Sequence, residues 1–168
     1  MKWTRTELID ARNNIEFDED VIISDDVVSN YSGIDAVENV HVSGRGYYSD
    51  ENDAFYVDMH IEGVMICPDS ITNEPIEYPF DTNAQETYSF TKNDDEDEVR
   101  YVSDEVDLLE AIIDNILLEV PMQVSVVDEE DYPEGEGWKV YSEKQYQEMK
   151  ENEIDPRLAI LKEYKEEK

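Results

Sequence analysis

The sequence predicts an α+β fold in which a mostly antiparallel sheet packs on one long central helix, followed by a polar helical C-terminal tail. Two observations support this prediction. One stretch, at about residues 104–120, repeats apolar residues at helical spacing, and several other segments alternate apolar and polar residues as half-buried strands do. We expect a single α+β domain over residues 1–138 and the helical tail over residues 139–168.

The central helix is predicted from apolar residues at steps of three and four. These residues are Val106, Leu109, Ile113, Ile116 and Val120, and the stripe is widened by Leu108, Ile112 and Leu117. Ser103 or Asp104 can cap the start of the helix, because short polar side chains accept hydrogen bonds from the first free N–H groups. Pro121 ends it, since proline lacks an N–H donor and disfavours helix at the preceding residue. The expected helix is roughly 25 Å long at 1.5 Å per residue.

The strands are predicted from shorter segments, with a helical turn expected within residues 7–14. The segments are residues 2–8, 15–18, 21–23, 39–44, 54–66, 74–80, 86–90 and 122–127. The polar residues 49–53 predict a hairpin between two of them. In the strand at 54–66, the alternation places Phe55, Val57, Met59 and Ile61 on one face. Gly63 interrupts this alternation and predicts a bulge.

The C-terminal tail is predicted to contain two helix starts. Ser142 and Gln145 form a capping box that opens a polar helix over residues 143–152. Asp155 followed by Pro156 is the second start signal, an acceptor cap before a proline in the first helical position. The narrow apolar edge of that second helix consists of Leu158, Leu161 and Tyr164. We therefore expect the tail to become ordered mainly on contact with another molecule.

The charge of the chain limits the partners that it can bind. With 13 basic and 45 acidic residues, the net charge is −32 at pH 7. Such a polyanion is repelled by phosphate backbones and by anionic lipid, which disfavours direct RNA binding by the body of the protein. A basic protein is the more natural partner. The alternative explanation of the charge is that carboxylates keep the surface soluble, or that the host is adapted to salt. Because like charges repel, we also expect added salt to stabilise the fold.

The sequence predicts a cytoplasmic protein. Cys67 is the single cysteine, so an internal disulfide is excluded and a reducing compartment fits. No apolar run follows the N-terminus, so no signal peptide is expected, and no stretch has the length needed to span a membrane.

Few residues suggest chemistry, and we expect no enzymatic activity and no cofactor. His41 and His60 lie in predicted strands without a second ligand nearby in sequence, which favours ordinary strand histidines over metal ligands. The acidic block at 93–98 is most simply an exposed loop, since it lacks the glycine and the spaced ligands of a calcium loop. The acidic surroundings of Cys67 favour a structural thiol over a nucleophile. These residues alone predict an acidic binding module.

A set of short motifs, taken in order and spacing, carries a resemblance to a known family. The motifs are Met1–Trp3, Val40–Gly44, Ile61–Gly63, Cys67–Ile71, Glu77–Phe80, Glu86–Phe90, Ile116–Val124, Gly135–Trp138, Ser142–Glu143 and Asp155–Lys162. Together they resemble the YceD family in its YlbN-like branch, the large ribosomal RNA subunit accumulation proteins. The most specific of them are the Asp155–Ala159 ending and the Leu117–Pro121 helix end.

The resemblance implies a cytoplasmic factor for accumulation or processing of the large-subunit ribosomal RNA, without an established enzymatic activity. Many relatives carry a Cys-x-x-Cys at the position of Cys67 and further cysteines after the central helix, which suggests zinc in those relatives. Here Ser70 replaces the second cysteine and no cysteine follows Pro121. One thiolate cannot build a structural zinc site that needs four ligands. We therefore assign no metal to Cys67.

The charge and the resemblance together predict a basic ribosomal protein or a pre-large-subunit particle as partner, and no membrane. The partner-binding residues that we predict lie in the tail. They are Asp155, Pro156, Arg157, Leu158 and Leu161. The alternative for this segment is a helix start whose arginine is merely solvated. Two other function classes stay open, an acidic protein that mimics nucleic acid or binds proteins generally, and a metal-dependent ribonuclease.

Overall fold

The computed structural model describes residues 1–11, 15–92 and 99–152. Contacts divide the chain into two compact units, Met1–Val124 and Ser125–Lys168, each of which is considered by itself. The acidic block at 93–98 and the predicted partner-binding residues at 155–161 lie outside the described residues, so the expectations placed on them stay predictions.

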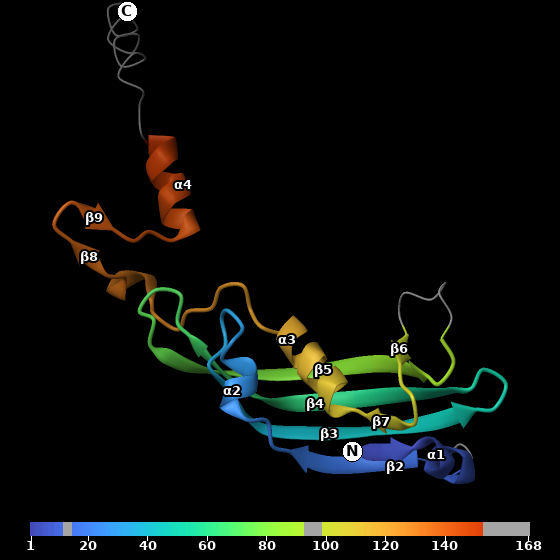
Figure 1. Ribbon diagram of the computed structural model, residues 1–168. Helices are drawn as coiled ribbons and strands as arrows, with labels where there is room; N and C mark the ends of the chain where they lie inside the picture. The colour runs from blue at the N-terminus through green and yellow to red at the C-terminus, as the bar shows by residue number, and fades with distance from the viewer. Residues whose placement is uncertain (12–14, 93–98, 153–168) are drawn as a thin grey trace, which may run out of the picture. The chain divides into compact units, whose positions relative to one another are not determined.

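A five-stranded sheet forms the frame of the first unit (Figure 1). Its spatial order is β2 (Ile15–Val21), β3 (Ala36–Ser49), β4 (Ala54–Pro68), β5 (Pro75–Ser89) and β6 (Arg100–Tyr101). Every pairing is antiparallel except the short parallel pairing of β5 with β6, which confirms the prediction of a mostly antiparallel sheet. The predicted hairpin joins β3 to β4, and the two segments predicted at 74–80 and 86–90 are one continuous strand.

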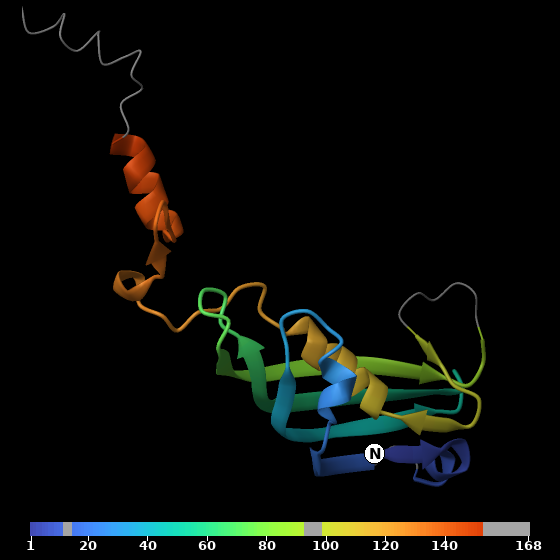
Figure 2. The same ribbon diagram turned by 60° about the vertical axis from the view of Figure 1, so that its left-hand side comes forward.

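The inner face of the sheet carries the core. Phe55, Val57, Met59 and Ile61 of β4 are at most 3% exposed, as their alternation predicts. This face is covered by α3 (Leu109–Leu118), α2 (Asp25–Val28), α1 (Arg5–Ala11) and a small antiparallel pair made of β1 (Lys2–Thr4) and β7 (Glu105–Asp107) (Figures 1 and 2). The segment predicted as a strand at 2–8 is therefore a strand only over β1, after which helix α1 begins.

The prediction of one long central helix at 104–120 is wrong. The helix α3 has 10 residues, and the residues before it form β7, in which Val106 lies opposite Trp3 and is fully buried. The helix starts where Asp107 Oδ1 accepts a hydrogen bond from Leu109 N at 3.1 Å, instead of at Ser103 or Asp104. The apolar residues at 106–108 suit a strand and a helix equally well, and the available partner strand β1 decides between them.

The buried stripe of α3 agrees in part with the one predicted. Ile112 and Ile116 are fully buried as expected, together with Ala111, whereas Leu109 is 38% exposed. The helix ends at Leu118, two residues before the Val120–Pro121 pair that was expected to stop it.

Two glycines in β3 let aromatic rings lie directly against its backbone. A Cβ on Gly46 would come within 2.2 Å of Phe55 Cζ, and one on Gly44 within 2.6 Å of Phe17 Cζ. The Trp3 ring contacts both phenyl rings, at centroid distances of 5.8 and 6.1 Å. The first strand is thereby held on the inner face of the sheet.

A bulge forms at Gly63 as predicted, but the extra residue belongs to the neighbouring strand. Asn39 and Val40 of β3 both face Gly63, because the β3–β4 register shifts there, whereas the β4–β5 register runs past Gly63 without a shift. There Asn39 has φ +53°, a left-handed conformation that asparagine tolerates better than most residues. The extra residue changes the phase of β3, so that Val37 and Val40 both point into the core.

The second unit is built from short elements. They are the 3₁₀ turn η1 (Glu129–Asp131), β8 (Glu134–Gly135) paired with β9 (Trp138–Lys139), and α4 (Glu143–Asn152). The capping box is confirmed, because Gln145 N donates to Ser142 Oγ at 3.2 Å and Ser142 N donates to Gln145 Oε1 at 3.3 Å. The strand predicted at 122–127 is wrong, since these residues have no strand pairing.

Candidate functional site: the open face of the sheet

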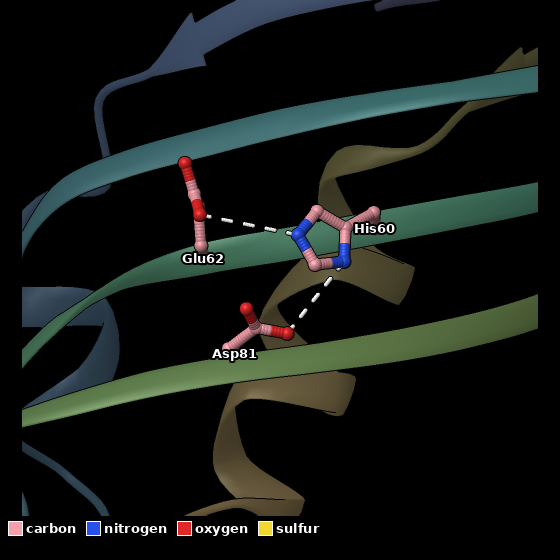
Figure 3. A group of neighbouring side chains, drawn as sticks. All are labelled: His60, Glu62 and Asp81. Atoms are coloured by element: carbon pink, nitrogen blue, oxygen red, sulfur yellow. Dashed lines mark ion pairs between the residues drawn. The ribbon is translucent and has the colours of Figure 1, made fainter.

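The outer face of the five-stranded sheet presents polar side chains in register across four strands. None of the described helices of the first unit lies over it, and Figure 3 shows α3 behind the sheet when this face is viewed. We call this surface the open face. Its members are Glu16, Asp18, Asp20, His41, Ser43, Arg45, Tyr47, Tyr56, Asp58, His60, Glu62, Asp81, Asn83, Gln85 and Thr87.

Carboxylates dominate the open face. Six of its members are acidic, and the one arginine, Arg45, is 80% exposed and lies 3.6 Å from Asp58 Oδ2. Alternation along β2 puts Glu16, Asp18 and Asp20 on the same side of that strand. A surface with this excess of carboxylates attracts cations and repels phosphate.

The two histidines of the chain lie on the open face, each beside carboxylates. His41 Nδ1 lies 2.8 Å from Asp20 Oδ1, and His41 Nε2 lies 3.3 Å from Asp18 Oδ1. The hydrogen bond to Asp20, together with the charge of Asp18, raises the pKa of His41 above its ordinary value. His60 lies between Glu62 and Asp81 (Figure 3), with its Nδ1 3.3 Å from Asn83 Oδ1.

A shallow hollow and an aromatic pair complete the surface. The hollow has a volume of about 540 Å³ and lies above Gly44, between Asp18, Asp58 and His60. Tyr47 and Tyr56 stack with their ring centroids 5.0 Å apart, and Tyr47 is 48% exposed. Aromatic faces of this kind attract the ammonium and guanidinium groups of a basic partner.

The basic side chains in the described part of the first unit are mostly engaged with its own carboxylates. Lys2 pairs with Asp107 at 3.0 Å, and Arg5 pairs with Asp53 at 2.8 Å. Arg100 bridges Glu86 on β5 and Asp114 on α3, at 2.9 and 2.6 Å. Burial opposes the charge of Arg100, but these hydrogen bonds outweigh it and raise the pKa of the guanidinium. Few basic side chains of this part of the chain are therefore available to bind a phosphate backbone.

The corner at Cys67 does not fit a zinc site. Cys67 is 1% exposed, and burial raises the pKa of its thiol, which disfavours the thiolate that binds zinc. Ser70, at the position of the missing cysteine, donates its N–H to Val124 O at 2.8 Å and accepts from Val124 N at 2.9 Å through Oγ. Hydrogen bonds between Ser70 and Val124 thus close this corner.

Sequence reasoning missed the open face as a unit. It placed His41 and His60 on strands correctly, but it assigned partner binding to residues 155–161, which lie outside the described residues. The signal available in the sequence was the alternation of acids in Glu16, Asp18 and Asp20, combined with the β3–β4 hairpin. The register that aligns the four strands cannot be deduced from the sequence of any one strand.

Comparisons with known proteins identify relatives of the whole chain. The sequence model of a family described as "Large ribosomal RNA subunit accumulation protein YceD" matches residues 57–165. The "Uncharacterized protein YlbN" of Bacillus subtilis (strain 168) is 36% identical over 169 aligned residues, which cover 96% of this chain and 94% of the relative. No solved structure matches the chain. Among the described residues, no helix combines the length and apolar character that crossing a membrane requires.

Proposed function

The chain belongs to the YceD family of large ribosomal RNA subunit accumulation proteins, and on that premise we propose that it is a non-enzymatic cytoplasmic factor in large-subunit biogenesis. It would support accumulation or processing of the large-subunit (23S) ribosomal RNA by binding a basic ribosomal protein or a pre-large-subunit particle. The family description names an effect on ribosomal RNA, not a catalysed reaction.

The acidic open face is the observation that supports a basic protein, and not RNA, as the direct partner of the sheet. Six carboxylates stand in rows on the face of the sheet that no described helix of the first unit covers, with one exposed arginine among them. RNA would meet like charge there, whereas a lysine-rich or arginine-rich segment would meet carboxylates and the Tyr47–Tyr56 pair. We therefore assign the basic partner to this face.

The tail is the second region that we assign to partner binding. Residues 139–168 carry seven basic and eight acidic residues, whereas residues 1–138 carry six and 37. The tail is thus the less acidic part of the chain and the part better suited to approach RNA. Within it, Asp155, Pro156, Arg157, Leu158 and Leu161 stay the proposed contact residues.

The test is a tagged pull-down from lysate at low and moderate salt, with and without ribonuclease. We expect a basic large-subunit protein that survives ribonuclease and dissociates as salt is added, because electrostatic pairing is screened by ions. Recovery of precursor particles that are lost on ribonuclease treatment would instead place the protein on the RNA-bearing assembly. Recovery of neither would contradict the proposal.

Two sets of substitutions locate the contact. Glu16→Gln, Asp18→Asn and Asp58→Asn together neutralise three carboxylates around the hollow. Asp50→Asn, Glu51→Gln and Glu74→Gln remove the same charge from exposed turns outside the open face. We expect the first set to release the partner and the second set to retain it. Equal loss from both sets would show that net charge alone governs binding.

Two further experiments separate the alternatives. An acidic nucleic-acid mimic would bind a panel of unrelated basic proteins equally well. A metal-dependent ribonuclease would cleave precursor RNA when magnesium is added to the purified protein.

A further inference from the structure

We propose that His60, Glu62 and Asp81, together with Asn83, form a binding site for one first-row divalent transition-metal cation such as Zn²⁺. The site lies on the open face, across strands β4 and β5. It goes beyond the proposed function, because binding of a metal requires no ribosomal partner.

Cross-strand register builds the site. His60 and Glu62 are two residues apart on β4 and therefore point to the same face. His60 pairs with Asn83 and Glu62 pairs with Asp81 in the β4–β5 register. The four side chains thus form two neighbouring cross-strand pairs on one face of the sheet, and they offer one nitrogen donor and three oxygen donors.

The distances between the donors leave room for an ion. One ligand atom from each of His60, Glu62 and Asp81 lies within 4.8 Å of the others. His60 Nε2 lies 3.9 Å from Glu62 Oε2 and His60 Nδ1 lies 3.7 Å from Asp81 Oδ1, ion-pair distances that are too long for a hydrogen bond (Figure 3). Neither carboxylate is therefore hydrogen-bonded to the ring, which offers one of its two nitrogens to a single cation. Bonds of about 2.0–2.2 Å to a central Zn²⁺ require the donors to close in by roughly 1 Å.

The exposure of these side chains makes that movement inexpensive. The side chains of His60, Glu62 and Asp81 are 37%, 52% and 68% exposed. They can change rotamer without disturbing the core, which lies on the other face of the sheet. A bound cation also removes the repulsion between the carboxylates of Glu62 and Asp81. We therefore expect the metal to stabilise the fold.

The donor set selects the class of metal. An imidazole nitrogen suits zinc, nickel, cobalt and copper, whereas calcium and magnesium prefer oxygen ligands alone. Two carboxylates and a neutral imidazole give the site a charge of −2, and the acidic surface raises the local concentration of cations. His41, across from Glu62 on β3, is directed to Asp18 and Asp20, so it stays outside the proposed ligand set.

This site is separate from the cysteine position of the relatives. Cys67 is buried on the inner face of β4, and His60 lies on the outer face of the same strand. A cation at one position cannot be shared with the other.

The test is a titration of the full chain with Co²⁺ and Zn²⁺, followed by cobalt absorption and by calorimetry. We expect one cation per chain, and a rise in melting temperature when it is bound. His60→Gln and Asp81→Asn should each weaken binding at least about tenfold, because each removes a direct ligand. Asp58→Asn is the matched control, since it removes the same charge from the next position along the open face of β4 without removing a donor. Each variant is checked by urea unfolding.

Three results would overturn the proposal. Equal weakening by Asp58→Asn and Asp81→Asn would show diffuse attraction to the acidic surface. Equal binding of Ca²⁺ and Zn²⁺ would show that the imidazole does not contribute. A cobalt–thiolate charge-transfer band would place the metal on Cys67.

Discussion

The two faces of one sheet have opposite chemistry, although the same strands build both. In β4, Phe55 is fully buried against Trp3 and the β3 backbone, and its neighbour Tyr56 lies on the open face, stacked on Tyr47. The inner face is closed by three helices and a strand pair. The open face meets solvent with six carboxylates. The alternation of a strand thus separates the residues that stabilise the fold from those that can respond to solvent and partners.

The largest expected difference between the faces comes from Phe55 and Tyr56. Phe55→Ala should lower the free energy of unfolding by about 3–5 kcal/mol, because it leaves a cavity under Trp3 and over Gly46. Tyr56→Ala should cost about 1 kcal/mol, since it removes mainly a half-buried ring that stacks on Tyr47. Urea unfolding of both variants measures the difference. Similar losses would mean that the open face is packed against something in solution.

A smaller difference is expected between two arginines. Arg100→Met should cost about 1–3 kcal/mol, because it leaves the largely buried Glu86 carboxylate with Asn115 as its remaining partner. Arg45→Met on the open face should change stability by less than about 0.5 kcal/mol, since Arg45 is exposed and its ion pair is long.

Equal urea midpoints for the two arginine variants would contradict the inference that Arg100 joins α3 to the sheet. Glu86→Gln in the Arg100→Met background sharpens the test. If an unpaired buried carboxylate causes the loss, the double variant should recover part of it.

Alternation along single strands was enough to predict the inner face from the sequence. Phe55, Val57 and Met59 are buried as their spacing indicates, and the box between Ser142 and Gln145 forms as predicted. Both depend on neighbours within a few residues. A second capping box, in which Glu7 accepts from Thr4 N at 2.8 Å, carried the same signal and was overlooked.

Features that depend on distant partners could not be predicted in this way. The spacing of Val106 predicts a helix. It is a strand residue only because it pairs with β1, which lies about a hundred residues earlier in the chain. The open face has the same origin, because His60 and Asp81 meet through the β4–β5 register. Spacing along one strand cannot reveal such a pair.

Repulsion on the open face predicts a still smaller effect of opposite sign. Glu16→Gln, Asp18→Asn and Asp58→Asn together should leave the chain equally stable or stabilise it, by up to about 1 kcal/mol at low salt. The gain should disappear in high salt, because ions already screen the charges of the wild-type chain. Urea midpoints at two salt concentrations measure this. A destabilised triple variant would show instead that these carboxylates hold the strands together.

The smallest effect expected is the pH response of His41. Its pKa is raised by Asp20 and Asp18, with Glu62 also near, so protonated His41 favours the folded state. This contribution is complete below the ordinary histidine pKa of about 6.5. It is lost as the pH rises through the higher folded-state value.

The stability difference between wild type and His41→Gln should therefore be largest in mild acid and shrink towards alkaline pH. Phe55→Ala, on the inner face, provides the contrast, because its loss should be the same at both pH values. NMR titration of the His41 ring gives an independent measurement, with a midpoint above that of a free histidine. A difference that stays the same at both pH values would mean that the carboxylates around His41 do not act on its proton, and the open face would then respond to pH no more than the core does.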